Sequence, residues 1–255
     1  MLQETTQAAA TTGSNADALK QMGFEHLAQE MLSHPGDYAI QLIVAATLLV
    51  MSAISIYWIV INLIKNMRLR RSADRVVSTF WETPNAQDAI RYMEEQPRSE
   101  PFSKIALDAA QAAAHHQRHE GSRLVDSLNR SEFVDRALRQ AVTRESLRLE
   151  DGLTVLATVG STAPFVGLLG TVVGIYNALL KIGATGQASI DAVAGPVGEA
   201  LIMTAFGLFV AIPAVLAYNY FVRRNRITNQ KFDSFAHDLH DFFATGARVG
   251  EAGRA

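Results

Sequence analysis

The stretch AVAGPVGEALIMTAFGLFVAIPAVLAYNYFV (192–222) decides the fold class, because it is a long apolar run whose only charged side chain is Glu199. An α-helix needs about 20 apolar residues to cross a bilayer, and this run is longer. A carboxylate inside such a helix costs roughly 2.5–3.5 kcal/mol on the mildest scale, so it faces a protein interior or a water-filled path. Glu199 is therefore the first candidate functional residue.

Two further uncharged runs cover residues 38–64 and 152–180. Each reaches at least about 30 Å as a helix, which is enough to span a membrane. Apolar runs alternate with charged stretches, as is typical of a polytopic membrane protein. The sequence therefore predicts an all-α fold with three transmembrane helices, at 38–64, 152–180 and 192–222.

Basic residues at the ends of these runs predict their orientation. Lys65, Arg68, Arg70 and Arg71 follow the first run, and Arg223 and Arg224 follow the third. Residues 1–37 contain a single Lys or Arg, Lys20. Because cytoplasmic flanks carry the excess of Lys and Arg, residues 1–37 are expected outside the membrane. Residues 65–151 then form a cytoplasmic helical domain, 181–191 an outer loop, and 223–255 a cytoplasmic tail.

The segment 65–151 is helical in pattern, with breaks expected at 83–85 (TPN) and at Pro97 and Pro101. Residues 102–150 have no internal proline, so we expect them to run into the second span as one nearly continuous helix. The tail 227–246 carries Phe232, Phe235 and Leu239 on one face, which predicts packing on the internal helices. Residues 1–20 and 250–255 are expected to be disordered, and 23–33 to form a short amphipathic helix.

Small residues repeat at helical spacing in the second and third spans. The predicted packing face comprises Gly160, Gly167, Gly170, Gly174 and Gly207. Such faces let helices approach closely, and packing within one subunit is the simpler explanation for these glycines. Three spans can hardly enclose a water path alone, so self-association into a ring would place Glu199 at a central pore. The alternative is that Glu199 is a structural acid near the outer face of the membrane that the third span crosses.

The stretches LATVGSTAPFVGLLGTVVGIYNAL (156–179) and AGPVGEALIMTAFGLFVAIPAVLAYNYF (194–221) resemble the ExbB/TolQ/MotA proton-channel family. The order of one span, a large internal segment and two more spans agrees with this family. Within it, the loop KIGATGQASIDAVAGPVGEAL and the outer extension resemble the ExbB members, with TolQ members the nearest relatives. Where the family's usual pattern is APGIAEAL, this chain has AGPVGEAL, with proline and glycine transposed.

The resemblance implies a multi-pass protein of the bacterial inner membrane that forms a homopentamer. Its pore would hold transmembrane helices of ExbD, and the complex would use the proton motive force to act on TonB. Protons would be the coupling ion, and no cofactor is implied. The family's proton-pathway residues correspond to Glu199, Thr171 and Thr204. Threonine hydroxyls both donate and accept hydrogen bonds, so they can relay protons without adding charge.

Several function classes find no support in the residues. The near-neutral net charge of −2 argues against a nucleic-acid partner, and the absence of cysteine excludes thiol chemistry. No nucleotide-binding or hydrolase motif occurs, so an enzyme is not expected. The helical spacing of His115, His116 and His119, without a metal-binding motif, indicates a solvated helix face rather than a metal site. Anionic phospholipid is a secondary partner of the basic flanks. The alternatives to the leading hypothesis are a TolQ-like subunit of the Tol-Pal system and a passive membrane scaffold.

Overall fold

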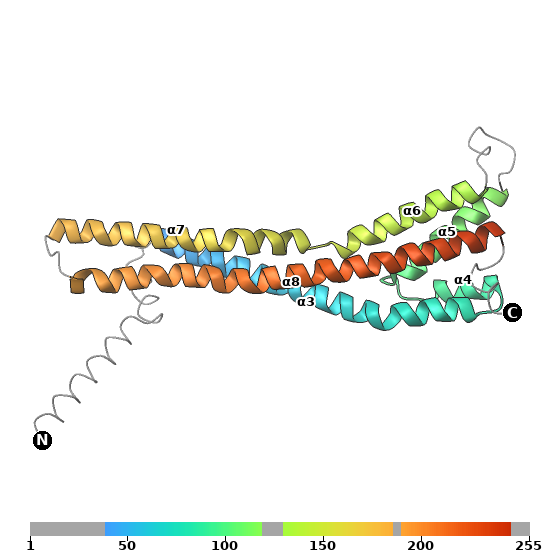
Figure 1. Cartoon of the computed structure of the whole chain (residues 1–255), viewed down its shortest axis with the longest axis horizontal. Coiled ribbons are helices and arrows are strands. Elements are labelled where there is room, and N and C mark those ends of the chain that lie inside the picture. The colour runs from blue at the N-terminus through green and yellow to red at the C-terminus, as the bar shows by residue number, and fades with distance from the viewer. Residues whose placement is uncertain (1–38, 119–129, 186–189, 246–255) are drawn as a thin grey trace, which may run out of the picture. The chain divides into compact units, whose positions relative to one another are not determined.

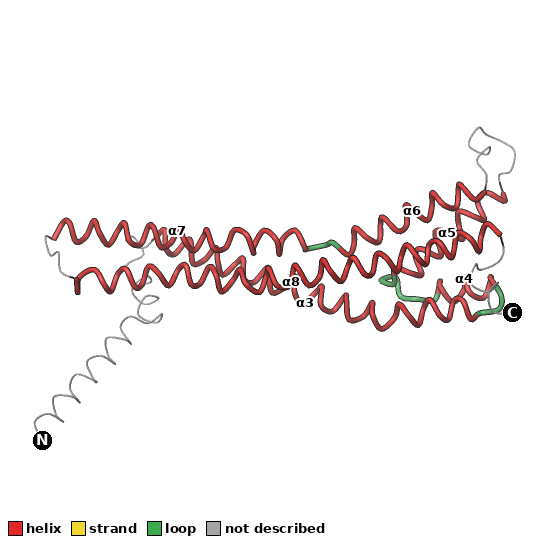
Figure 2. Tube along the Cα trace, in the orientation of Figure 1, coloured by secondary structure: helices red, strands yellow, loops and turns green. Residues whose placement is uncertain are grey.

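The structure, a computed structural model, describes residues 39–118, 130–185 and 190–245. Within these ranges all regular secondary structure is α-helical, joined by short loops (Figure 1, Figure 2). The helices are α3 (Ala39–Glu82), α4 (Ala86–Glu94), α5 (Pro101–Arg118), α6 (Arg130–Leu149), α7 (Leu153–Thr185) and α8 (Ile190–Thr245). The described part contains three helices long and apolar enough to cross a membrane, which confirms the predicted all-α, three-span fold.

Some predictions concern residues that the structure does not describe. The expected amphipathic helix at 23–33 and the expected disordered ends, 1–20 and 250–255, lie outside the described ranges. The same holds for His119 and for residues 186–189 of the predicted outer loop. The described part of that loop is helical, because α7 extends to Thr185 and α8 begins at Ile190.

The described residues form two compact units. The first, here called the apolar unit, contains residues 39–59 of α3, 155–185 of α7 and 190–218 of α8. Its core is small and includes Leu48, Ala163 and Ala214, which are fully buried. Large apolar side chains lie on its outside, among them Phe209, which is 72% exposed. Such a surface suits contact with lipid or with other membrane helices rather than with water.

The second unit, here called the amphipathic unit, contains residues 60–118, 130–154 and 219–245. Its core is aromatic at the centre, where the ring of Phe102 lies 4.9 Å from that of Phe232 and 5.6 Å from that of Phe235. Both pairs meet edge to face, a favourable arrangement for aromatic rings. The predicted packing of the C-terminal tail on the internal helices is thereby confirmed.

Local sequence explains where the helices of this unit begin and end. α3 ends at Glu82, and Asn85 caps α4 by accepting a hydrogen bond from the Gln87 backbone N–H at 3.0 Å. α5 begins at Pro101, because proline is tolerated in the first turn, where its missing N–H leaves no bond unmade. The predicted breaks at 83–85 and around Pro97 and Pro101 are confirmed.

The expected nearly continuous helix from residue 102 into the second span is wrong. α5 and α6 are separate helices that pack on each other, with ion pairs between Lys104 and Glu145 and between Asp108 and Arg144.

A second break lies at residues 150–152, between α6 and α7. Gly152 has a φ of 80°, a left-handed backbone that favours glycine. Two amides from distant parts of the sequence bind the carbonyls at this joint. Asn225 donates to Leu149 O at 2.6 Å, and Asn62 donates to Asp151 O at 3.2 Å. The two amides thus bind carbonyls that the end of a helix leaves unpaired, and these contacts stabilise the break between α6 and α7.

Candidate functional site

α7 and α8 approach each other closely along the predicted small-residue face. A Cβ built on Gly167 would lie 2.6 Å from Met203 O, and one built on Gly207 would lie 2.6 Å from Ala163 O. No side chain fits at either position without moving backbone. The remaining glycines of the face lie against Val215 (Gly160), Met203 and Val44 (Gly170), and Ala200 (Gly174). The partners on α8 run backwards as α7 advances, so the two helices are antiparallel.

Thr171 and Thr204 meet within this contact. Their hydroxyl oxygens are 2.5 Å apart, and the Thr171 hydroxyl also lies 3.1 Å from Ala200 O and 3.3 Å from Gly167 O. Thr171 is buried, while Thr204 is partly exposed. The pair that the sequence placed on neighbouring helices is therefore in direct hydrogen-bond contact.

This pair of hydroxyls has two hydrogen-bonding arrangements. In one, Thr171 donates to a carbonyl, Ala200 O or Gly167 O, and accepts from Thr204. In the other, Thr171 donates to Thr204, whose own hydrogen is then available to another acceptor. A hydroxyl carries one hydrogen and two acceptor lone pairs, so both arrangements satisfy its bonding. Switching between them reverses the direction of the hydrogen bond between the two hydroxyls, which is one step of a proton relay. Transfer beyond Thr171 needs a further group with an exchangeable hydrogen, because Ala200 O and Gly167 O only accept.

Glu199 lies on α8 five residues before Thr204 and on a different face of the helix. It precedes Ala200, whose carbonyl accepts from Thr171 and whose Cβ packs at Gly174. Successive side chains on a helix differ by about 100°, so Glu199 points to the side of the α7 contact. Its side chain is partly exposed. Glu199 and Thr204 thus lie within two turns of α8, and Thr171 lies on the turn of α7 that faces Thr204.

The predicted membrane-flanking basic residues have different surroundings. Lys65 forms an ion pair with Asp151 at 3.7 Å, and Arg224 donates to the Tyr220 hydroxyl at 3.3 Å while its guanidinium lies over the same ring. Arg68 lines a cavity of about 330 Å³ in the amphipathic unit. Arg70, Arg71 and Arg223 are exposed.

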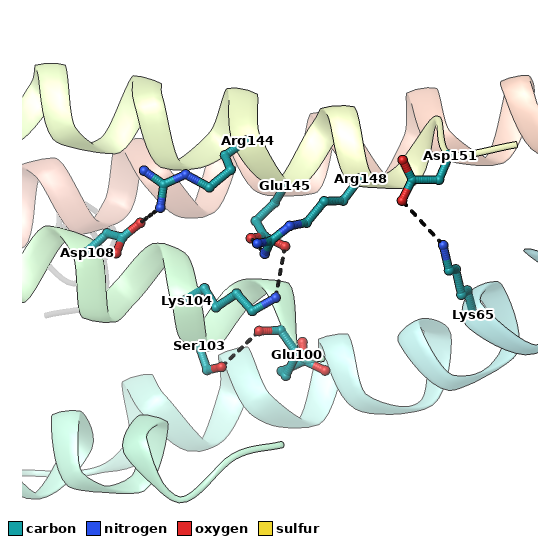
Figure 3. A network of polar contacts seen from close by, with 9 residues as sticks. All are labelled: Lys65, Glu100, Ser103, Lys104, Asp108, Arg144, Glu145, Arg148 and Asp151. Carbon is teal, nitrogen blue, oxygen red and sulfur yellow. Dashed lines mark hydrogen bonds and ion pairs between the residues drawn. The ribbon is translucent and has the colours of Figure 1, made fainter. Parts of the chain in front are cut away.

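A network of charged residues joins α3, α5 and α6 around that cavity (Figure 3). Glu145 is buried and accepts from Lys104 at 3.4 Å and from Arg148. Glu100, also buried, accepts a 2.5 Å hydrogen bond from the Ser72 hydroxyl. Burial raises the pKa of the Glu100 carboxyl, and the bond from Ser72 opposes that rise only in part. The network ties these helices together and contains one acid, Glu100, whose pKa is raised by burial.

Sequence reasoning did not single out Gln41, Asn62, Glu100 or Asn225, which are all buried polar side chains. The signal for Gln41 was an amide inside an otherwise apolar run, three and seven residues before the core residues Val44 and Leu48. Helical spacing therefore places it on the core-facing stripe of α3. No cluster of three His, Cys, Asp or Glu side chains able to hold a metal occurs among the residues that the structure describes.

These features define a multi-pass helical membrane protein whose second and third apolar helices bury a polar site at their contact. The model of the MotA/TolQ/ExbB proton channel family matches residues 100–234, and the chain belongs to that family. "Biopolymer transport protein ExbB" of Xanthomonas campestris pv. campestris is 71% identical over 252 residues, covering 98% of this chain and 100% of the relative.

Two further relatives extend the comparison. "Biopolymer transport protein ExbB" of Neisseria gonorrhoeae is 44% identical over 193 residues, or 76% of this chain and 87% of that protein. "Tol-Pal system protein TolQ" of Pseudomonas aeruginosa is 49% identical over 108 residues, or 42% of this chain and 47% of that protein. The similarity to these two ExbB proteins thus extends over much more of the chain than the similarity to this TolQ.

Proposed function

We propose that this chain is the proton-channel subunit of an energy-transducing complex in the bacterial inner membrane. It would assemble as a homopentamer around transmembrane helices of ExbD and act on TonB, energising uptake of iron-siderophores and cobalamin across the outer membrane. The full-length similarity to an ExbB protein supports this assignment of the complex. The observation that carries the proton-channel role is the Thr171–Thr204 hydroxyl contact beside Glu199.

In this proposal the N-terminus is periplasmic and the C-terminus cytoplasmic, with membrane helices at 38–64, 152–180 and 192–222. The excess of Lys and Arg after the first and third spans supports this orientation. The loop 181–191 is then periplasmic, and the amphipathic unit, with residues 65–151 and 223–255, lies in the cytoplasm. Protons are the coupling ion, and anionic phospholipid binds the basic flanks as a secondary partner.

Each of the three pathway residues has a distinct task. Glu199 takes up and releases a proton as the ring's half of a site completed by an acid of the partner helix. Thr171 and Thr204 pass protons along their hydrogen bond without becoming charged. The membrane potential supplies about 2.3 kcal/mol per charge per 100 mV, so several protons are needed for each mechanical event.

The test is proton flux into proteoliposomes that contain the purified complex, combined with growth on iron-limited medium. We expect Glu199→Gln to abolish both while the complex still assembles. Thr171→Val and Thr204→Val remove only a hydroxyl and should weaken both less severely. Normal siderophore uptake by Glu199→Gln would refute the proton-channel role and favour a passive scaffold. Wild-type growth of both threonine variants would remove the relay role alone.

A TolQ-like role in the Tol-Pal system is the second candidate, favoured by the match of 108 residues to a TolQ protein. The two roles differ in the partner rather than in the site. Affinity purification of the tagged chain from its own membranes should recover ExbD in the first case and TolR in the second. Recovery of TolR without ExbD would replace the first assignment with the second.

A further inference from the structure

Gln41 lies on the core-facing stripe of α3, in the apolar unit. Val44 and Leu48, one and two turns further along, are buried core residues. A Cβ built on Gly170 would lie 3.0 Å from Val44 Cγ1, and one built on Gly174 would lie 3.7 Å from Gln41 Nε2. α3 is therefore antiparallel to α7, and Gln41 lies at the level of Gly174.

Burial of the Gln41 amide is energetically unfavourable. The residue is only 6% exposed, and its Oε1 accepts no hydrogen bond from the part of the chain that the structure describes. A buried acceptor without a partner is unfavourable, and more so where lipid replaces water around the helices. An apolar side chain would suit the stripe that Val44 and Leu48 continue. A polar group in this position is expected to serve a ligand that can donate a hydrogen bond.

The surroundings of Gln41 connect it to the hydroxyl pair. Gly174 has no side chain, and across it lies Ala200, the neighbour of Glu199. The carbonyl of Ala200 accepts from Thr171, which precedes Gly174 by three residues, or about 4.5 Å along the helix axis. One or two water molecules span such a distance, because hydrogen-bonded oxygens are about 2.8 Å apart. At this level α7 and α8 are in close contact, since a Cβ built on Gly174 would lie 2.9 Å from Ala200 Cβ, and the missing side chain lets the amide from α3 lie against the polar contact of the two helices.

We infer that Gln41 Oε1 binds a water molecule that belongs to the proton path and connects its outer end with the Thr171–Thr204 pair. The inference rests on the proposed proton-channel function and adds a residue from the first span to it. The bound water accepts a proton on its outer side and releases another to the next hydrogen-bonded oxygen, so it returns to neutral water. Gln41 itself gains and loses no proton; it holds the water in place.

The test compares Gln41→Met with the wild type in proteoliposomes that contain the purified full-length complex. Methionine keeps the length of the side chain and removes the acceptor. We expect proton flux to fall about fivefold to tenfold, the factor that a lost hydrogen bond represents. The thermal unfolding midpoint should stay or rise, because an unpaired buried acceptor is removed. The solvent isotope effect on flux should increase, which a structural role alone would not cause.

The matched control is Ser55→Ala, which removes another buried polar group from α3. Ser55 is 14 residues from Gln41, or about 21 Å along the helix, so flux should keep its wild-type value. Unchanged flux and isotope effect in Gln41→Met would overturn the inference. If Gln41→Met fails to assemble, Gln41→Asn decides, because it retracts the amide by one methylene: reduced flux supports the inference and wild-type flux overturns it. Failure of both variants to assemble would overturn the inference, because Gln41 would then be required for folding or assembly.

Glu199→Gln measured in the same vesicles separates this inference from the function on which it rests. Flux lost in Glu199→Gln but kept in Gln41→Met refutes only the role of Gln41. Flux kept in Glu199→Gln refutes the proton-channel function itself.

Discussion

Replacing Gly167 by alanine should separate α7 from α8 at the hydroxyl pair. The new Cβ would lie 2.6 Å from Met203 O and 3.1 Å from Gly207 Cα, which are both backbone atoms. Ordinary contact requires a displacement of about 0.8 Å. The same displacement would lengthen the Thr171–Thr204 contact from 2.5 Å to about 3.3 Å, the length of the much weaker contact between Thr171 and Gly167 O.

Two measurable effects follow from this displacement. Overpacking of a close contact costs about 1–3 kcal/mol, so the thermal unfolding midpoint of the purified protein should fall. Weakening of the hydroxyl contact should lower proton flux into proteoliposomes about tenfold if it removes about 1.4 kcal/mol of stabilisation. The matched control is Gly183→Ala on the same helix, where a built Cβ meets no atom within 4 Å. That variant should keep both stability and flux.

Wild-type stability together with wild-type flux in Gly167→Ala would refute the reasoning. Lower stability with wild-type flux would retain the helix packing and separate it from proton transfer. A gain of stability in both glycine variants would mean that the α7–α8 contact is looser than the Gly167 geometry indicates.

Three further predictions concern the amphipathic unit and use unfolding of the purified protein as the measurement. Burial raises the pKa of Glu100, so the folded chain holds this proton more tightly than the unfolded chain, and stability falls as pH rises from the ordinary pKa of 4.5 through the folded value. Glu100→Gln should therefore match the wild type below that window and exceed it above; a pH-independent difference would contradict this. Phe102→Ala should cost about 3–5 kcal/mol, since the side chain is 1% exposed between two other rings, and a cost under about 1 kcal/mol would exclude a central place in the core. Asn225→Ala should cost about 1–3 kcal/mol by leaving Leu149 O without its donor, whereas Asn229→Ala, whose Oδ1 has no partner in the described chain, should cost less.

The spans and the principal helix breaks were predictable because each depends on local sequence. Segregation of charge from long apolar runs identifies membrane helices without knowledge of their neighbours. Asn85 and Pro101 act on the helix that follows them, so position in the sequence is sufficient. Thr171 and Thr204 could be placed on adjacent helices by resemblance, but their 2.5 Å contact depends on how α7 and α8 are aligned.

The remaining features depend on partners far apart in the sequence. Residues 150–152 lie in a stretch with helical character, yet Asn62 and Asn225 bind the carbonyls of an interrupted joint. Neither amide is near the joint in sequence, so Gly152 is the local signal for a helix end there, and the contacts that fix the joint cannot be read from neighbouring residues. The burial of Gln41 likewise requires the register of α3 against α7. Tertiary contacts determine which of these polar side chains are buried. In the sequence, only the helical periodicity of the apolar residues in α3 indicates that Gln41 faces the core.

The 2.5 Å spacing of the two threonine oxygens has a consequence for ion selectivity. A hydrogen-bonded pair of hydroxyls transfers a proton by exchange of bonds, but a sodium or potassium ion must pass bodily and needs several oxygen ligands around it. Oxygens already in contact leave no space for an ion between them, and neither carries a charge that would attract one. At this point of the proposed path, discrimination against larger cations therefore follows from close packing and requires no charged filter. The glycines that bring α7 and α8 together would in this way also set which ion the site accepts.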